Sequence, residues 1–416
     1  SFGAVGLLFY IGSGRLAEAH WLRQWGRAQW TMSIGMLPLL LALFQQFSLV
    51  SPLANAVAIP LVSFVITPLA LLAAIPGLEF LLHPAHAVLS ALMVLMQWLA
   101  DLPGSAWQQA AAPIYLTLLA VVGALWLLLP RGMPARWLGL LPLATLLCWA
   151  PPRPAPGALR ATVLDVGQGL AVHVQTAAHD LLFDAGPAFS DEADSGNRII
   201  LPYLRAAGVR HLDLLVITHA DSDHSGGVES VVDGIAVDRM QTSIPFENRL
   251  AALPVGQDRC IAGQSWEWDG IRFEFLHPRA DDYEKEGGKS NDMSCVLKIV
   301  SASGSMLLTG DIEARSELRL VAETADKLRA DVLLVPHHGS RTSSTPAFIA
   351  AVGAPEVIIP VGYRNRYRHP HPAVLARYDG VSLHRTDRDG AVTVRYSGGT
   401  PTISMARADD RRYWRE

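Results

Sequence analysis

The sequence predicts two unlike halves: an α-helical polytopic membrane segment over residues 1–150, followed by an α/β domain over residues 159–416. The first half carries almost no charge, whereas the second alternates short apolar runs with helical stretches. The proline-rich spacer PPRPAPGA, residues 151–158, separates the two compositions. The many strands predicted in the second half fit two mixed sheets that pack together and are covered by helices.

The scarcity of charge places the first half in a membrane. Between Arg27 and Arg131 the only charged residues are Glu79 and Asp101, whereas about a quarter of a soluble domain is charged. Four apolar stretches approach the roughly 20 residues that cross a bilayer. A fifth is shorter. In chain order they are residues 30–50, 54–76, 84–101, 113–130 and the short 137–150.

Pro60 and Pro68 interrupt the second stretch. Because a broken backbone at membrane depth is tolerated where protein or a cavity surrounds it, a re-entrant or broken helix is one interpretation. An ordinary kinked helix is the other.

The basic residues predict the orientation of the spans. Positive-inside bias places the clusters before the first span and after the fourth in the cytoplasm. These clusters are Arg15, Arg23, Arg27 and Arg131, Arg136. If residues 137–150 cross, the α/β domain is extracytoplasmic; if they lie in the interface, it is cytoplasmic. We expect crossing, and therefore a multi-pass inner-membrane protein whose second half lies outside the cytoplasm.

The start of the chain and the cysteines say little about the fold or the compartment. The chain starts on an apolar run without a signal peptide, so we expect it to be cut from a longer polypeptide. Cys148, Cys260 and Cys295 are too few and too scattered for a disulfide framework or a cysteine zinc site. Cysteine usage therefore leaves the redox compartment open, and the net charge of −4 decides little.

The second half predicts a series of strands with helices between several of them. A helix is expected near residues 198–207, where Gly208 ends it. The expected strands are residues 161–166, 170–175, 180–183, 214–217, 271–276, 294–300, 305–309, 331–336, 355–360, 381–386 and 391–396.

The stretch LVITHADSDHSG, residues 215–226, marks a site at the end of a buried strand. Its apolar run stops abruptly in His219, Asp221, Asp223 and His224. Imidazoles and carboxylates crowded this closely can hold two divalent metals, because a cation neutralises carboxylates that would otherwise repel. A polar turn that happens to be rich in His and Asp is the alternative.

Other ionisable residues also follow predicted strands. Asp184 follows one strand, Asp311 another, and His337 with His338 a third. Such positions converge at one edge of a sheet, so we expect them to join the loop. A second polar cluster, with arginines 364, 366 and 368 beside it, indicates either phosphate and nucleic-acid contact or a solvated loop. It contains Asn365, Tyr367, His369 and His371.

At these residues the chain resembles a family. THADSDHSGG is similar to the metal motif of the metallo-β-lactamase fold, with Asp221 where most members carry a second histidine. The sequence is identified as a member of the ComEC competence proteins from that change together with further motifs. These are LDVGQGLAV (164–172), LLFDAGP (181–187), NDMS (291–294), LLTGDIE (307–313), VPHHGS (335–340), NRYRHPHP (365–372) and, in the first half, SPLANAVAIPLVSF (51–64).

The resemblance implies a metallo-β-lactamase-like αββα sandwich and an arrangement of ligands. His219 and Asp221 would hold one metal, Asp223 and His224 the other, and Asp311 would bridge them. One of His337 and His338 would complete the second metal, and the spacing leaves open which. HGS compares slightly better with the HAS-type motif of related nucleases. Asp184 would support the loop from behind the ligands.

One histidine of the fold has no obvious counterpart, and NDMS stands in its region. Asn291, Asp292 or Ser294 would then reach the metal or a DNA phosphate, as would Asn365, Tyr367 and His369 of the second cluster. An oxygen-rich site favours Mn²⁺ or Mg²⁺ beside, or instead of, Zn²⁺.

The function implied is DNA uptake in natural transformation. A channel in the lipid bilayer would pass one DNA strand, and a two-metal nuclease would hydrolyse the strand left outside, with Asp223, His224 and Asp311 as catalytic residues. Other DNA-uptake proteins would be partners. The alternatives are a channel with an inactive, DNA-guiding domain, and a metallo-hydrolase of small substrates.

Overall fold

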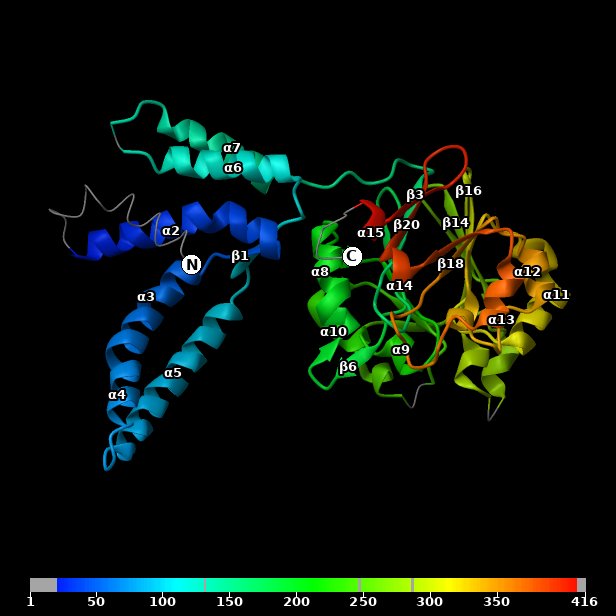
Figure 1. The fold of residues 1–416 in the computed structure, drawn as a ribbon, viewed down its shortest axis with the longest axis horizontal. Coiled ribbons are helices and arrows are strands. Elements are labelled where there is room, and N and C mark those ends of the chain that lie inside the picture. The colour runs from blue at the N-terminus through cyan, green and yellow to red at the C-terminus, as the bar shows by residue number, and fades with distance from the viewer. Residues whose placement is uncertain (1–20, 131, 246–247, 286–287, 410–416) are drawn as a thin grey trace. The chain divides into compact units, whose positions relative to one another are not determined.

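The computed structural model describes residues 21–130, 132–245, 248–285 and 288–409. The chain divides into two compact units (Figure 1). The first is Ser1–Pro151 with Arg205–Gly208, and the second is Pro152–Leu204 with Val209–Glu416. Two expectations rest on residues outside this description: the apolar start of the chain, from which we expect a longer polypeptide, and Arg15, which belongs to the first basic cluster.

Among its described residues, the first unit contains helices and one short antiparallel strand pair (Figure 1). Its elements in chain order are α2 (Trp21–Phe44), β1 (Gln46–Ser48), α3 (Ser51–Leu61), η1 (Val62–Ile66), α4 (Thr67–Leu72), η2 (Glu79–Leu81), α5 (Leu82–Ala100), β2 (Ala106–Gln108), α6 (Ile114–Leu127), η3 (Arg136–Gly139) and α7 (Leu140–Leu147).

Two helices of the described residues are long and apolar enough to cross a membrane, namely Ser51–Leu72 and Glu79–Ala100. Ile114–Leu127 and Arg136–Leu147 are apolar but shorter. The structure therefore does not confirm the expected polytopic segment. The predicted span 113–130 is shortened because Pro113 precedes the helix and the helix ends before Pro130.

The prolines of the second stretch do not break it. Between Pro60 and Pro68 the backbone forms the π-helical turn η1, and the residues that flank this turn keep helical dihedral angles. Because proline removes one backbone donor, a local change to π hydrogen bonding lets the helix continue. Of the two interpretations, the structure has the continuous helix.

The second unit contains two large sheets. The eight-stranded sheet has the order β12 (Gln257–Arg259), β11 (Met240–Thr242), β9 (Leu214–Ile217), β5 (Asp180–Phe183), β4 (Val172–Gln175), β3 (Leu159–Val163), β20 (Val392–Tyr396), β21 (Thr402–Met405). The seven-stranded sheet has the order β13 (Ser265–Trp268), β14 (Ile271–His277), β15 (Val296–Ser301), β16 (Gly304–Leu308), β17 (Val332–Leu334), β18 (Glu356–Ile359), β19 (Ser382–Arg385).

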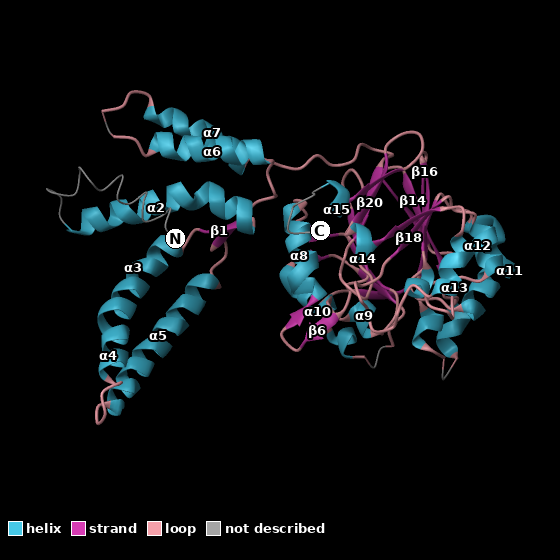
Figure 2. Ribbon diagram, viewed as in Figure 1, coloured by secondary structure: helices cyan, strands magenta, loops and turns pink. Residues whose placement is uncertain are grey.

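Helices lie on the outer faces of both sheets: α8 and α10 on one side, α11, α12 and α13 on the other (Figure 2). Two further sheets have two strands each. One pairs β6 (Ala188–Ser190) with β7 (Ala193–Asp194), and the other pairs β8 (His211–Leu212) with β10 (Ala236–Val237). The helical elements are η4 (Gly196–Ile200), α8 (Leu201–Ala206), α9 (Ser222–Ser225), α10 (Val228–Gly234), η5 (Arg249–Ala252), η6 (Ala280–Glu284), η7 (Ser290–Met293), α11 (Ala314–Leu328), η8 (Pro336–Gly339), α12 (Pro346–Val352), α13 (Pro372–Leu375), η9 (Ala376–Tyr378), α14 (Thr386–Asp389) and α15 (Ala406–Asp409).

The main core lies between the two sheets. It contains Phe183 and Val216 from the first sheet and Phe273 and Leu308 from the second, all fully buried. Burying an apolar side chain of this size stabilises the fold by about 1.5–3 kcal/mol relative to leaving it exposed. This core holds the sheet ends that carry the polar residues in register with each other.

Parallel pairing decides where those ends meet. In the first sheet β5 pairs parallel with β9, and in the second β16, β17 and β18 are parallel neighbours. The carboxyl ends of parallel strands lie at the same edge. The residues that follow β5, β9, β16 and β17 are therefore gathered at one edge of the sandwich.

The predicted strands agree with the observed ones to within a few residues, and β5 coincides with its prediction. The predicted strand 161–166 ends earlier, at Val163, because the chain turns at Gly167, which has φ +79°. The predicted strand 294–300 begins later, at Val296, because Ser294 and Cys295 make their hydrogen bonds outside the sheet.

One disulfide forms although the sequence predicts no disulfide framework. Cys260 follows β12 and Cys295 precedes β15, so the bond joins the two sheets; both cysteines are fully buried, and their Cα atoms lie 6.1 Å apart. Their separation of 35 positions along the chain conceals this proximity in the sequence. Cys148 is a free, exposed thiol.

The first predicted motif, LDVGQGLAV, supports the loop that follows β9. Gly169 has φ +153°, and a Cβ atom there would lie 2.4 Å from the carbonyl oxygen of Asp223. The next residue, Leu170, donates its N–H to that same oxygen at 3.1 Å. Glycine is therefore required for this close approach.

We expect Gly169→Ala to destabilise the segment 158–416 by about 1–3 kcal/mol, because the added methyl group displaces the Asp223 backbone. Gly167→Ala is the matched control: Gly167 also has positive φ, but nothing lies within 4 Å of its added Cβ. Gly167→Ala should lower the free energy of unfolding by about 1 kcal/mol, because only the unfavourable backbone conformation contributes. Urea unfolding measures both, and equal losses would contradict the close contact.

Candidate metal centre

The loop after β9 presents its polar residues in a tight turn. Thr218 and His219 follow the strand, and the short helix α9 carries Asp223 and His224. His219 and His224 lie side by side, with ring centroids 4.2 Å apart. Both imidazoles are buried, whereas the Asp221 side chain is 48% exposed. The loop thus turns two nitrogen ligands inward.

Asp184 holds this loop from behind. Its side chain is fully buried and accepts hydrogen bonds from the Thr218 N–H at 2.7 Å and the Thr218 hydroxyl at 2.8 Å. It also lies 2.7 Å from His224 Nδ1. A proton on Nδ1 leaves Nε2 of His224 free to bind a metal, which is how a carboxylate behind a histidine ligand orients it.

The second sheet supplies the opposite side of the cluster. Asp311 comes after β16, and its Oδ1 lies 3.0 Å from His224 Nε2. His338 follows β17, and its Nδ1 lies 2.7 Å from the carbonyl oxygen of Pro360, a hydrogen-bond acceptor. Nδ1 must therefore be the donor, and Nε2 of His338 is directed into the cluster, where it can bind a metal when it carries no proton.

Four of the expected ligands meet there. One ligand atom each from Asp223, His224, Asp311 and His338 lies within 4.8 Å of the others. The buried Nε2 atom of His219 has no hydrogen-bond partner, and Oδ1 of Asp311 has none apart from its ion pair with His224. Because buried polar atoms without partners are costly, these atoms fit a divalent cation, for which a mixed nitrogen and oxygen donor set is suitable.

Burial and charge set the protonation of the cluster. Burial beside His224 lowers the pKa of His219 to about 3, so this ring is neutral and able to bind a metal. Burial opposes a charge on His224, but the carboxylates of Asp311 and Asp184 outweigh it and raise its pKa well above the ordinary value. Burial likewise disfavours the Asp311 carboxylate, but His224 and His338 hold its pKa well below the usual range.

Asp223 faces the opening of the cluster. Its side chain is 30% exposed, compared with 5% for Asp311, and its Oδ2 lies 3.4 Å from His338 Nε2. Burial would raise the pKa of Asp223, but the hydrogen bond from His338 and the nearby His224 lower it to about 2. This carboxylate is thus ionised and meets solvent.

His219 and Asp221 lie beside the four-residue cluster rather than in it. His219 Nε2 is 3.7 Å from Asp221 Oδ2. The hydroxyl of the fully buried Ser294 lies 3.3 Å from His219 Nδ1 and accepts the Asp311 N–H at 3.1 Å. Ser294 therefore contacts ligand candidates from both sheets, but not as a ligand at the cluster itself.

His337 lies at the rim. Its Nε2 is 3.7 Å from Asp311 Oδ2, and its Nδ1 is 3.1 Å from the Thr342 hydroxyl. Asn291 Nδ2 is 3.5 Å from His337 Nε2. Of the two adjacent histidines, only His338 places an imidazole nitrogen in the four-residue cluster.

The loop 363–371 carries the remaining predicted residues. Asn365 uses its side chain within the loop, donating to the Gly362 and His369 carbonyls and accepting the His369 N–H. It does not reach the cluster. Tyr367 stacks on His369 at 5.7 Å, and His369 meets His337 edge to face at 5.9 Å. This loop therefore adjoins the rim.

Sequence reasoning missed Thr218, whose hydroxyl lies within hydrogen-bonding distance of Asp184, His219 and His224. Its position inside the motif THADSDH was the available signal. It also missed Pro360, which orients His338 through a backbone carbonyl and so leaves no trace in side-chain chemistry.

Family comparisons agree with these two units. A family model described as Competence protein matches residues 1–134, and one described as Metallo-beta-lactamase superfamily matches residues 164–239. Fold and site thus define a metallo-β-lactamase-type domain that follows a competence-protein segment. Among solved structures, the metallo-β-lactamase fold protein YhfI from Bacillus subtilis aligns with 57% of this chain and 99% of its own, at 12% identity and a TM-score of 0.38.

The chain belongs to the ComEC family of competence proteins. Competence protein ComA of Neisseria gonorrhoeae is 41% identical over 94% of this chain and 54% of its own length. Recombination protein 2 of Haemophilus influenzae is 32% identical over 59% and 30% of the two chains. ComE operon protein 3 of Bacillus subtilis is 31% identical over 58% of this chain and 34% of its own length. The chain thus spans about half the length of these relatives, or less.

We expect metal binding to release protons and to strengthen as pH rises. The raised pKa of His224 means that the metal-free chain holds a proton there at neutral pH, and a metal must displace it. Affinity therefore falls as pH drops below that pKa. Calorimetry with Mn²⁺ in buffers of different ionisation enthalpy counts the protons.

Asp184→Asn should weaken the binding about 10–100-fold and release fewer protons, because one of the two carboxylates that raise the His224 pKa is lost. Asp180→Asn is the matched control, since Asp180 is a buried carboxylate 3.0 Å from His173 and outside the cluster. Identical proton release in the two variants would contradict the assignment.

Proposed function

We propose that this chain acts in DNA uptake during natural transformation, as part of an inner-membrane channel for single-stranded DNA. Its second unit would be a metal-dependent nuclease that hydrolyses phosphodiesters of the strand that is not transported. The observation that carries the proposal is the cluster of Asp223, His224, Asp311 and His338 in a chain whose first unit matches a competence-protein family model.

The residues suggest how hydrolysis would proceed. Two divalent cations, Mn²⁺ or Zn²⁺ and alternatively Mg²⁺, would activate a water and stabilise negative charge on the phosphate. His224 and His338 would bind from opposite sheets, and Asp311 lies between them. His219 and Asp221 would hold the other cation. Asp223, the most exposed member of the cluster, would orient the attacking water while remaining a ligand.

The rim loop supports a nucleic-acid substrate. Tyr363 and Tyr367 are 67% and 51% exposed, and the guanidinium groups of Arg364 and Arg366 lie 5.1 Å and 4.8 Å from the respective ring centroids. Exposed aromatic rings stack on bases, and arginines bind phosphates. With His369 beside His337, this surface would hold a DNA strand next to the cluster.

The disulfide supports an extracytoplasmic position for the nuclease unit. Disulfides persist in oxidising compartments and are rare in the cytosol. Cys260 and Cys295 are both fully buried, so their bond is protected from reductants.

We expect Asp223→Ala and His224→Ala each to reduce metal-dependent DNA cleavage by the segment 158–416 more than about 100-fold, because each removes a ligand. Asp233→Ala, which removes an exposed carboxylate on α10, should leave the rate unchanged. Cleavage of a labelled single strand with Mn²⁺, Mg²⁺ and Zn²⁺ measures this. Undiminished cleavage by either ligand variant would refute the site.

In cells, we expect Cys260 and Cys295 to be oxidised and Cys148 to be reduced. Acid quenching, followed by alkylation of the denatured chain with a mass-tagged maleimide, should modify one thiol. After reduction it should modify three. Modification of three thiols without reduction would argue for a cytoplasmic domain.

A further inference from the structure

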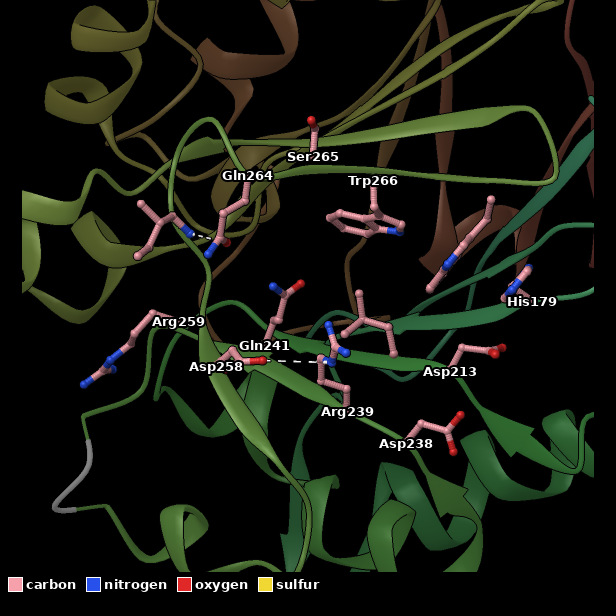
Figure 3. A pocket seen from close by; sticks show the side chains of 13 residues that line it. His179, Asp213, Asp238, Arg239, Gln241, Asp258, Arg259, Gln264, Ser265 and Trp266 are labelled. Atoms are coloured by element: carbon pink, nitrogen blue, oxygen red, sulfur yellow. Dashed lines mark hydrogen bonds and ion pairs between the residues drawn. The ribbon is translucent and has the colours of Figure 1, made fainter.

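A cavity lies in the second unit and is lined by none of the residues of the metal cluster (Figure 3). Its volume is about 800 Å³. It opens between β12, the edge strand of the eight-stranded sheet, and β13, the edge strand of the seven-stranded sheet. The side chains important to its chemistry are Trp266, Trp268, Gln241, Gln264, Arg239 and Asp258.

The cavity and the metal cluster share no residue. Leu214, at the amino end of β9, lines the cavity, whereas His219 follows the carboxyl end of that strand. Five residues of extended chain span about 15 Å. A ligand in this cavity would therefore be held apart from the reacting phosphate.

Aromatic rings form one wall. The Trp266 indole stacks parallel on Phe273, with centroids 5.2 Å apart and planes at 6°, while Trp268 stacks on His179 at 4.8 Å. In Figure 3 the Trp266 ring lies over the side chains of Gln241 and Arg239. The buried Nε1 atom of Trp266 has no hydrogen-bond partner. This wall offers a flat surface to a planar ring.

An unpaired amide faces this wall. Gln241 is only 9% exposed, and its side chain makes no hydrogen bond among the described residues. In Figure 3 the amide points from the strand toward Trp266. Because no hydrogen bond within the protein uses this amide, its N–H and C=O groups are available to a ligand in the cavity. Gln264 adds a second amide, whose Oε1 accepts the Ile261 N–H and whose NH₂ group remains available.

The charges of the cavity nearly balance. Arg239 lies 3.9 Å from Asp258, Arg259 adds a second guanidinium group, and Asp213 and Asp238 add two further carboxylates to the lining. With one more carboxylate than guanidinium group, the lining does not favour a phosphate. A neutral ring whose edge both donates and accepts hydrogen bonds suits the aromatic wall and the amides.

We propose that this cavity binds one unpaired nucleobase of the DNA strand, stacked on Trp266 and hydrogen-bonded along its edge by Gln241. The inference rests on DNA being the substrate and adds a second point of attachment for it. Side-chain amides pair bidentately with base edges, and an indole stacks on any base. A base in a duplex is stacked between its neighbours and has no free face for the indole, so the cavity selects single-stranded DNA.

The test uses the full chain in detergent with EDTA, so that binding is measured without cleavage. The probe is a single-stranded oligonucleotide carrying one 2-aminopurine, whose fluorescence is quenched when it stacks. Gln241→Leu and Trp266→Ala should each raise Kd about tenfold or more. Gln257→Leu is the matched control, because it removes an amide from the adjacent strand, outside the cavity, and should bind like the wild type.

Wild-type affinity in Gln241→Leu, or equal affinity for an oligonucleotide with abasic sites, would overturn the proposal. If Trp266→Ala does not fold, Gln241→Leu still decides. Cleavage with Mn²⁺ separates this inference from the proposed function. Quenching without cleavage supports the base site and contradicts the nuclease, whereas cleavage without quenching supports the nuclease and overturns the base site.

Discussion

The buried carboxylate of Asp184 organises the candidate metal centre. Asp184 is fully buried and is surrounded by the N–H and hydroxyl of Thr218 and by Nδ1 of His224. A buried charge is tolerated only when hydrogen bonds compensate it. This requirement joins the end of β5 to the end of β9 and to helix α9. It also orients His224 toward Asp311, so the position of the loop follows from one compensated charge.

The two sheets depend on each other at this edge. Neither sheet alone holds all the candidate ligands, because His219, Asp223 and His224 follow β9 whereas Asp311 and His338 follow strands of the second sheet. The Cys260–Cys295 disulfide crosses between the same sheets, and Cys295 donates its N–H to the Thr218 carbonyl at 3.1 Å. At the open edge of the sandwich, where β12 faces β13, the sheets instead leave a cavity.

Much of the candidate site can be predicted from local sequence patterns. A buried strand shows itself as an apolar run, and a run that stops at Asp184, His219 or Asp311 marks a strand end at a sheet edge. For this reason eleven strands were predicted to within a few residues, whereas β11, β12, β13 and β21 of the two large sheets were missed. The helices of the apolar first half were less predictable, because apolar composition continues through turns. Pro113 and Pro130 shorten a stretch that composition alone presents as a full span.

The sequence by itself indicated the change of composition between the two halves, eleven of the strands and the residue types of the candidate metal centre, since each of these is a local pattern. Only the tertiary structure decided that His338 rather than His337 enters the cluster, that Asn365 is used within its own loop, and that Cys260 meets Cys295. It alone set Gln241 beneath Trp266. The physical reason is that these contacts join strands far apart in the chain, and their distances depend on how the two sheets pack.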